Sequence, residues 1–290
     1  MITLTLQMDA DYKVPSRNNS LDEITMSDQE FNSLSELVYL RTGIVLTDKK
    51  RGLVYNRLRH VLRQNEIPSF HEYNLLLRND DTGFYLSEFI SRITTNFTYF
   101  NRENSHFSFM CERVLPKFTK ETMLRVWSAG CATGAETYDL AMNIQDYSAR
   151  QKAIAHWMVL GTDISREAID RAAAGTFSLD QVENVPDDKR KLYFTRDAEG
   201  RYVLRDTLRT NVKFRVLNLL RESLPFQHKF HIIFCRNVMI YFDEKTRTEV
   251  VRKLINCLTP GGYLFLGHCE ALPNLPDTLR REGPSIYSRR

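Results

Sequence analysis

The segment Leu124-Arg-Val-Trp-Ser-Ala-Gly130-Cys-Ala-Thr-Gly134-Ala-Glu136 decides the fold class of this 290-residue chain. Its first half, residues 124–129, has the composition of a buried β-strand. The two glycines let the backbone turn sharply and come close to a ligand. The residues that follow, 136–144, favour a helix. A strand, a glycine-containing turn and a helix in this order form the first unit of an α/β sheet.

The same alternation continues towards the C-terminus. Short β-rich runs are separated by helical segments, which predicts a mostly parallel sheet covered on both faces. The runs are 157–161, 212–219, 230–235 and 263–266, and the helices are 165–174 and 244–258.

A second pattern interrupts this alternation between residues 193 and 216. Three β-rich runs, 193–194, 201–204 and 213–216, lie close together here. Asp197-Ala-Glu-Gly200 separates the first two and is typical of a hairpin turn. We therefore expect a small antiparallel β-subdomain at about residues 193–216.

The N-terminal part is helical in pattern. After a polar leader, residues 1–24, Ser27-Asp-Gln-Glu30 forms a capping box that predicts the start of a helix. Apolar residues then recur at helical spacing up to Gly43, which predicts the end of that helix. Further helices are expected near 47–64, 70–78 and 84–93, so residues 25–95 form an all-helical domain.

Composition limits the function classes. The formal net charge of +4 is too mild to argue for nucleic acid by itself. No run approaches the roughly 18 apolar residues that span a bilayer. The five cysteines form no C-x-x-C pair, which favours reduced thiols in a cytoplasmic protein. The seven histidines have no ligand spacing, so we expect no metal.

The first two strands place candidate ligand-binding residues at the carboxyl edge of the sheet, where open parallel sheets bind ligands. Asp163 follows the second strand, where an acid accepts hydrogen bonds from ribose hydroxyls. Ala132 and Ala135 occupy two of the glycine positions of the dinucleotide fingerprint G-x-G-x-x-G. An adenosyl donor without phosphates, S-adenosylmethionine, therefore fits better than a nicotinamide cofactor. The alternative is a plain strand–helix turn with a surface aspartate.

Three segments together carry a family resemblance. They are Ile93-Thr-Thr-Asn96-Phe-Thr98-Tyr-Phe-Asn-Arg102-Glu, the glycine segment above, and Phe234-Cys-Arg236-Asn237-Val-Met-Ile-Tyr241-Phe-Asp with the later Leu258–His268 stretch. From about residue 25 to the C-terminus the chain resembles the CheR family of chemotaxis receptor glutamate methyltransferases.

The resemblance implies a fold and an activity. The fold is an α/β, Rossmann-like S-adenosylmethionine-dependent methyltransferase domain with a small antiparallel β-subdomain, preceded by the all-helical domain. Residues 96–120 would form a linker that contributes to the donor site, and residues 121–290 the methyltransferase domain. The activity would be methyl transfer to glutamate side chains in the cytoplasmic domains of methyl-accepting chemotaxis receptors, leaving S-adenosylhomocysteine. We expect a monomer that neither binds nucleic acid nor inserts into a membrane.

The resemblance also implies the site residues. Arg102 and Tyr241 would flank the transferred methyl group as catalytic residues. Their alternatives are a linker salt bridge of Arg102 with Glu103 or Glu112, and a rim aromatic for Tyr241. Glu136 could hold the donor's α-ammonium group or be a simple charge at a helix start. The donor-binding set is Asn96, Thr98, Arg102, Glu136, Asp163, Asn218, Leu219, Arg236 and Asn237.

The chain departs from the family pattern at three places. Asn101 replaces a usual phenylalanine, and the loop that usually reads G-E-E-P-Y-S is Gly134-Ala-Glu-Thr-Tyr-Asp139. The late H-S-E segment is His268-Cys-Glu270. Some members carry a longer, glycine-rich loop that grips a receptor's C-terminal pentapeptide, whereas Arg196–Arg201 is short here. We therefore expect receptor recognition without a pentapeptide tether.

The second helix carries a basic face, defined by Lys49, Arg59 and Arg63. Residues 48–64 contain six basic residues and one acid, and the apolar residues lie on the opposite arc. A solvated surface is the simpler interpretation. The alternative is a docking surface for acidic receptor helices.

Two rival functions stay open. A nucleic-acid methyltransferase of the amino type carries a proline-rich loop after the fourth strand, and a cytosine-5 enzyme uses Pro-Cys. Here the strand end reads Phe234-Cys-Arg-Asn-Val-Met239, which disfavours both. A donor-binding regulator without turnover is the second rival, and the changed loop at 134–139 motivates it.

Overall fold

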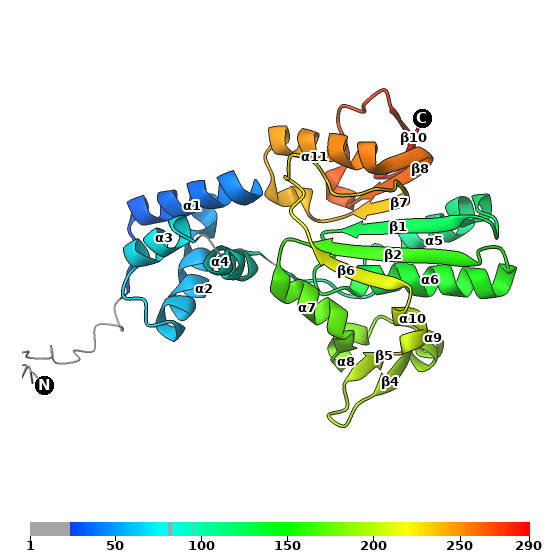
Figure 1. Ribbon diagram of the computed structural model, residues 1–290, viewed down its shortest axis with the longest axis horizontal. Helices are drawn as coiled ribbons and strands as arrows, with labels where there is room; N and C mark the ends of the chain where they lie inside the picture. The colour runs from blue at the N-terminus through cyan, green and yellow to red at the C-terminus, as the bar shows by residue number, and fades with distance from the viewer. Residues whose placement is uncertain (1–23, 81–82, 95) are drawn as a thin grey trace, which may run out of the picture.

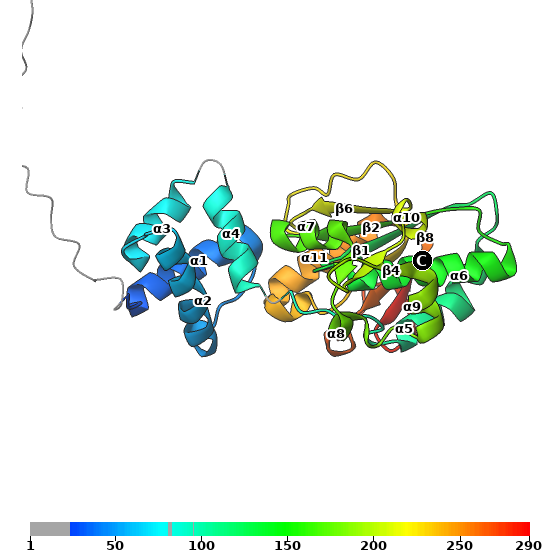
Figure 2. The same ribbon diagram turned by 90° about the horizontal axis from the view of Figure 1, so that it is seen from below.

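The computed structural model describes residues 24–80, 83–94 and 96–290. Apart from Ile24, the expected leader lies outside this part of the chain. A helical lobe and a larger sheet lobe lie side by side (Figures 1 and 2).

The helical lobe follows the sequence pattern closely. Ser27 accepts the N–H of Glu30 while Glu30 accepts the N–H of Ser27 at 2.7 Å, so the predicted capping box is confirmed. Gly43 closes the first helix at φ 70°, a left-handed conformation that glycine adopts readily. The elements are α1 (Asp28–Thr42), η2 (Asp48–Lys50), α2 (Arg51–Gln64), α3 (Phe70–Arg78) and α4 (Phe84–Ile93).

The main sheet has the strand order β6-β2-β1-β7-β8-β10-β9. The first five strands in this order are parallel, and the last two pair antiparallel, so the predicted mostly parallel sheet is confirmed. The strands are β1 (Met123–Ala129), β2 (His156–Asp163), β6 (Val212–Val216), β7 (Phe230–Cys235), β8 (Leu258–Leu266), β9 (Leu279–Gly283) and β10 (Ile286–Arg289).

Alternate residues of the central strands face two separate cores. Ile232 and Phe234 of β7 pack with α6 (Ala135–Gln151), while Ile233 and Cys235 pack with α11 (Glu244–Cys257). The second core continues into the helical lobe. Both sheet faces are therefore covered, as a parallel sheet requires.

The small β-subdomain is present, but one of its expected strands belongs elsewhere. Its order is β3-β5-β4, antiparallel, from β3 (Thr176–Phe177), β5 (Tyr202–Leu204) and β4 (Phe194–Arg196). The assignment of residues 213–216 to it is wrong, because β6 pairs in parallel with β2 at the edge of the main sheet. Helices α8 (Leu179–Val182), α9 (Asp187–Tyr193) and α10 (Asp206–Arg209) lie around the subdomain (Figure 1). Helix α7 (Arg166–Ala174) packs against β2 and β6 of the main sheet.

Residues 96–120 run from the helical lobe to the sheet and contain α5 (Ser105–Phe109), one π-helical turn η3 (Met110–Val114) and η4 (Leu115–Lys117). Two short elements follow strands on the same side of the sheet: η5 (Met239–Tyr241) after β7 and η6 (His268–Glu270) after β8.

Backbone contacts fix the helical lobe against the sheet. Ile44 forms an antiparallel bridge with Phe242, and Val45 N–H donates to the Tyr241 carbonyl at 2.9 Å. The Asn218 side chain donates to the Arg41 carbonyl at 2.7 Å. In the described part of the chain, every helix is too short or too polar to cross a bilayer.

Candidate functional site

A cavity lies between the two lobes at the carboxyl ends of the parallel strands. Its volume, including the open solvent at its mouth, is about 900 Å³. The structure brings every predicted donor-binding and catalytic residue to this cavity: Asn96, Thr98, Arg102, Glu136, Asp163, Asn218, Leu219, Arg236, Asn237 and Tyr241.

The glycine turn forms one wall of the cavity. Gly130 has φ +79°, and a Cβ there would lie 2.2 Å from Cγ2 of Val238. Gly134 has φ +93°, and its Cβ would lie 2.8 Å from the Cβ of Ala172. Ala132 adopts φ +47° without being glycine. The tight turn predicted from the sequence is confirmed, and packing as well as backbone conformation requires its two glycines.

Asp163 closes the same wall at the end of β2. One of its oxygens accepts the Ala132 N–H and the other the Ser165 N–H, both at 2.9 Å. Burial raises the pKa of this carboxyl group, and the backbone donors oppose that shift. Each oxygen has a second lone pair for a hydroxyl group in the cavity.

Glu136 and Arg236 form a buried ion pair at the floor of the cavity. Arg236 Nε lies 2.9 Å from Glu136 Oε2, and the Ser128 hydroxyl donates to Oε1 at 2.7 Å. The Nε–H makes no hydrogen bond, so the contact is ionic. Burial raises the pKa of Glu136, while Arg236 and Ser128 oppose this. The guanidinium also lies over the rings of Phe107 and Phe234.

Arg102 lies in a turn between two left-handed residues, Asn101 at φ 61° and Glu103 at φ 52°. Arg236 donates to the Arg102 carbonyl. The Arg102 side chain donates to the Phe97 carbonyl at 3.4 Å and, over the described residues, pairs with neither of the acids considered as linker partners. Its guanidinium lines the cavity, where it could meet a carboxylate.

Tyr241 also lines the cavity and belongs to η5. The ammonium group of Lys50 lies 5.1 Å from the centroid of its ring. Thr42 and Ile44 also line the cavity. The sequence did not indicate that the helical lobe contributes to this site, because these residues precede the donor-site motifs by about fifty positions.

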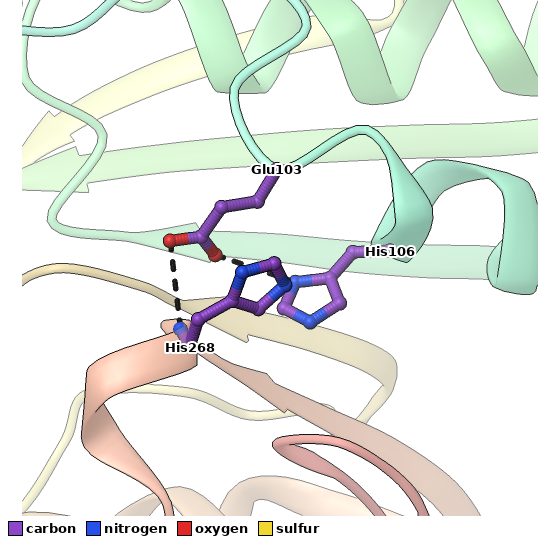
Figure 3. Close-up of side chains that lie close together, drawn as sticks. All are labelled: Glu103, His106 and His268. Carbon is purple, nitrogen blue, oxygen red and sulfur yellow. Dashed lines mark hydrogen bonds and ion pairs between the residues drawn. The ribbon is translucent and has the colours of Figure 1, made fainter.

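A polar cluster that the sequence did not predict lies behind the cavity floor (Figure 3). Glu103 accepts the His268 N–H at 3.4 Å and lies 3.7 Å from Nδ1 of His106. The three side chains could hold a metal ion by distance alone. However, Arg236 Nη1 lies 3.4 Å from His106 Nδ1, and this fixed positive charge disfavours a metal ion beside it. Burial, then Arg236, lowers the pKa of His106 to about 4. The absence of a metal stays a prediction.

The basic face lies on the helical lobe and contributes no residue to the cavity lining. Its apolar counterpart is confirmed: Val54, Leu58, Val61 and Leu62 are fully buried. Lys49 is exposed, Arg63 is half-buried, and the half-buried Arg59 lies 5.5 Å from the Tyr55 ring centroid.

Known proteins resemble the chain over both lobes. The family described as "CheR methyltransferase, SAM binding domain" matches residues 96–287, and "CheR methyltransferase, all-alpha domain" matches residues 29–94. A chemotaxis protein methyltransferase of Borreliella burgdorferi is 36% identical over 255 residues, 86% of this chain and 90% of the relative. That of Escherichia coli is 36% identical over 271 residues, 92% and 93% respectively.

The cavity agrees with the cofactor that this family uses. The buried carboxylate of Asp163, the close-packed glycine turn and the absence of a phosphate-binding fingerprint suit an adenosyl ligand. The site lies where an open parallel sheet binds such a ligand. The chain belongs to the CheR family of chemotaxis methyltransferases, and its sheet domain binds S-adenosylmethionine.

Proposed function

We propose that the protein transfers the methyl group of S-adenosylmethionine to glutamate side chains of chemotaxis receptors. A C–O bond forms as the S–CH3 bond breaks, which gives a glutamyl methyl ester and S-adenosylhomocysteine. The observation that supports this most directly is the composition of the cavity lining. Arg102 and Tyr241 both line the cavity, where they would face a carboxylate acceptor, and that acceptor would need no general base.

The acceptor's chemistry explains this composition. A glutamate side chain has an ordinary pKa of about 4.3 and is already an anion at neutral pH. A methyl sulfonium donor supplies an electrophilic carbon and a neutral leaving group. The protein therefore needs only to position the reactants, which can remove about 7–11 kcal/mol of the barrier when the geometry is good.

Specific residues would hold the donor. Asp163 has lone pairs for ribose hydroxyls, and Glu136 is a carboxylate for the α-ammonium group. Asn218 and Leu219 would contact adenine. The remaining donor contacts in the proposal come from Asn96, Thr98, Arg102, Arg236 and Asn237.

Two residues would act on the acceptor. Arg102 offers a planar fork of donors that matches a carboxylate. Tyr241 offers a hydroxyl group near the acceptor oxygen. Both line the cavity between the lobes, so the receptor glutamate would enter there.

The receptor itself would dock on the helical lobe. The basic face suits an acidic helical partner and would mainly raise the association rate. We propose that the protein acts as a cytoplasmic monomer and needs no pentapeptide tether.

The test uses the full chain, radiolabelled S-adenosylmethionine and membranes that contain a chemotaxis receptor. The expected result is base-labile label on the receptor, because methyl esters hydrolyse in base. An Arg102→Ala variant of equal thermal stability should lose most of that label. Calorimetry with S-adenosylhomocysteine checks donor binding separately.

The outcomes separate the rivals. Label on added nucleic acid would favour a nucleic-acid methyltransferase. Donor binding without label on any tested receptor would favour the regulator. Base-stable label on the receptor would overturn the carboxylate as acceptor.

A further inference from the structure

The turn that carries Arg102 has an unusual backbone. The residues on both sides of Arg102, Asn101 and Glu103, are left-handed although neither is glycine. Asparagine tolerates this conformation better than most residues, but glutamate does so poorly. Contacts from other elements must therefore hold the turn in place.

One side of the turn is held by Arg236. Its guanidinium donates to the carbonyl of Arg102 and, at 3.5 Å, to that of Glu103. This side belongs to the donor site already described.

The other side of the turn is held by α6. Asn101 N–H donates to Oδ2 of Asp139 at 2.7 Å. The Asn101 side chain donates to the Asn184 carbonyl at 2.5 Å, which ties the turn to the segment between α8 and α9. Asp139 and Asn101 are two of the positions where the chain departs from its family pattern, and the structure places them in direct contact.

Asp139 is an unusual group to find in this place. It is 1% exposed, and among the described residues no cation pairs with it. The nearest candidates are engaged elsewhere, because Lys189 pairs with Asp146 at 3.0 Å and Arg236 pairs with Glu136. Burial raises the pKa of Asp139 to about 8; the Asn101 N–H, Arg236 and Lys189 oppose the shift, and Glu136 adds to it. A carboxyl group buried in this way requires a specific hydrogen bond.

We propose that Asp139 is a positioning residue for methyl transfer: its buried carboxyl group accepts the Asn101 N–H and so fixes the turn that presents Arg102 to the donor cavity. The role in methyl transfer rests on the proposed function. The hold on the turn itself does not, because it is a property of the folded chain.

The first test measures the turn directly. Amide hydrogen exchange at Asn101, followed by NMR in the full chain, should be slow in the wild type and in Asp139→Asn, which keeps an acceptor oxygen. Exchange should become about tenfold faster or more in Asp139→Ala, which removes the acceptor. Equal exchange in all three proteins would overturn the proposal.

The second test asks whether Asp139 acts through Arg102. Affinity for S-adenosylhomocysteine and receptor methylation rate are measured for the wild type, Asp139→Ala, Arg102→Ala and the double variant. Asp139→Ala should lower the methylation rate on the order of 10- to 100-fold, the usual effect of a misplaced group. In the Arg102→Ala background the same change should add little, since coupled residues are not additive.

Controls keep these outcomes interpretable. Thr137→Val alters another fully buried polar side chain of α6, one that faces Gly161 rather than the turn, and should change neither readout. Asp139→Asn should keep both the exchange rate and the methylation rate close to those of the wild type. A full Asp139→Ala effect in the Arg102→Ala background would show a general structural role and overturn the proposal. If the wild type binds S-adenosylhomocysteine but methylates no receptor, the proposed function fails, while the exchange results still decide whether Asp139 holds the turn.

Discussion

Two groups of charged residues in this molecule act under opposite physical conditions. The buried charge cluster of Arg236, Glu136, Glu103 and His106 lies beneath the donor cavity, with the Arg236 side chain only 2% exposed. The basic face of Lys49, Arg59 and Arg63 lies on the surface of the helical lobe. Charges in the interior interact strongly and are little screened, whereas surface charges interact weakly and respond to salt. The cluster therefore suits the positioning of groups, and the basic face suits the attraction of a partner.

Removal of Arg236 should produce the largest effect. Arg236→Leu leaves Glu136 and Glu103 buried without their cation, and breaking a buried pair in this way costs about 3–5 kcal/mol. We expect this loss in the free energy of unfolding in urea at neutral pH, together with loss of binding to S-adenosylhomocysteine.

Arg236→Lys sharpens the same prediction. It keeps the charge but loses the fork that reaches the backbone of the Arg102 turn. Its unfolding free energy should fall less than that of Arg236→Leu, while donor affinity should still be poor. A Leu variant as stable as the wild type would contradict the view that this cluster depends on its cation.

The pH dependence of stability should report the cluster through His106. Burial and Arg236 lower its pKa to about 4, below its ordinary value of about 6.5. The unfolded chain then binds more protons between these values, so stability present above pH 6.5 is lost as the pH falls through 4. His106→Gln should remove this pH-dependent loss of unfolding free energy, which is on the order of 3 kcal/mol.

The measurement is urea unfolding of the wild type and His106→Gln at several pH values. The difference between the two proteins isolates this histidine from other titrating groups, such as Asp139. A difference in unfolding free energy that stays constant from pH 7 to pH 4 would show that the fold does not lower the pKa of His106.

Charge reversal on the basic face should have a smaller and more specific effect. Arg59→Glu with Arg63→Glu should lower receptor methylation about tenfold at low salt, because steering of an acidic partner is lost. The difference should shrink as salt is raised. Affinity for S-adenosylhomocysteine should not change.

A matched control is Lys120→Glu with Lys191→Glu, two exposed lysines of the sheet lobe. It changes the net charge equally but leaves the basic face intact, so methylation should be retained. Equal loss in both double variants would show that net charge matters and that the basic face does not.

Much of the fold was predictable because local patterns determine it. The capping box at Ser27 and the left-handed Gly43 bound α1 by local chemistry alone. Strand β3 was missed because two residues are too few to show a period. Strand β6 was assigned to both the main sheet and the β-subdomain, because its alternation of buried Val212 and Phe214 fits either sheet equally well, and only the main-sheet assignment is confirmed.

The candidate site was predictable where motifs carry it, and less so where distant segments meet. Every residue in the resemblance-based set lines one cavity. The contributions of Thr42 and Ile44, the contact of Asp139 with Asn101, and the packing of His106 against His268 depend on tertiary structure. A single chain contains no local signal for such pairs, although the two family departures at 101 and 139 were visible.

The smallest effect should come from a third charged region, the turn between β4 and β5. The carboxylate of Asp197 accepts the N–H groups of Glu199 and Arg201 at 3.1 and 2.8 Å and pairs with the Arg201 side chain at 2.7 Å. The Asp197 carboxylate and the Arg201 side chain therefore already have partners within the turn, and few polar groups remain there to bind a peptide. Removal of a receptor's C-terminal residues should therefore leave its methylation rate unchanged, and calorimetry with the free tail peptide should detect no binding. Tight peptide binding that Arg201→Ala weakens would show that an exposed charge of this chain holds a partner in a fixed position. The contrast between buried charges that position groups and surface charges that only attract a partner would then be wrong.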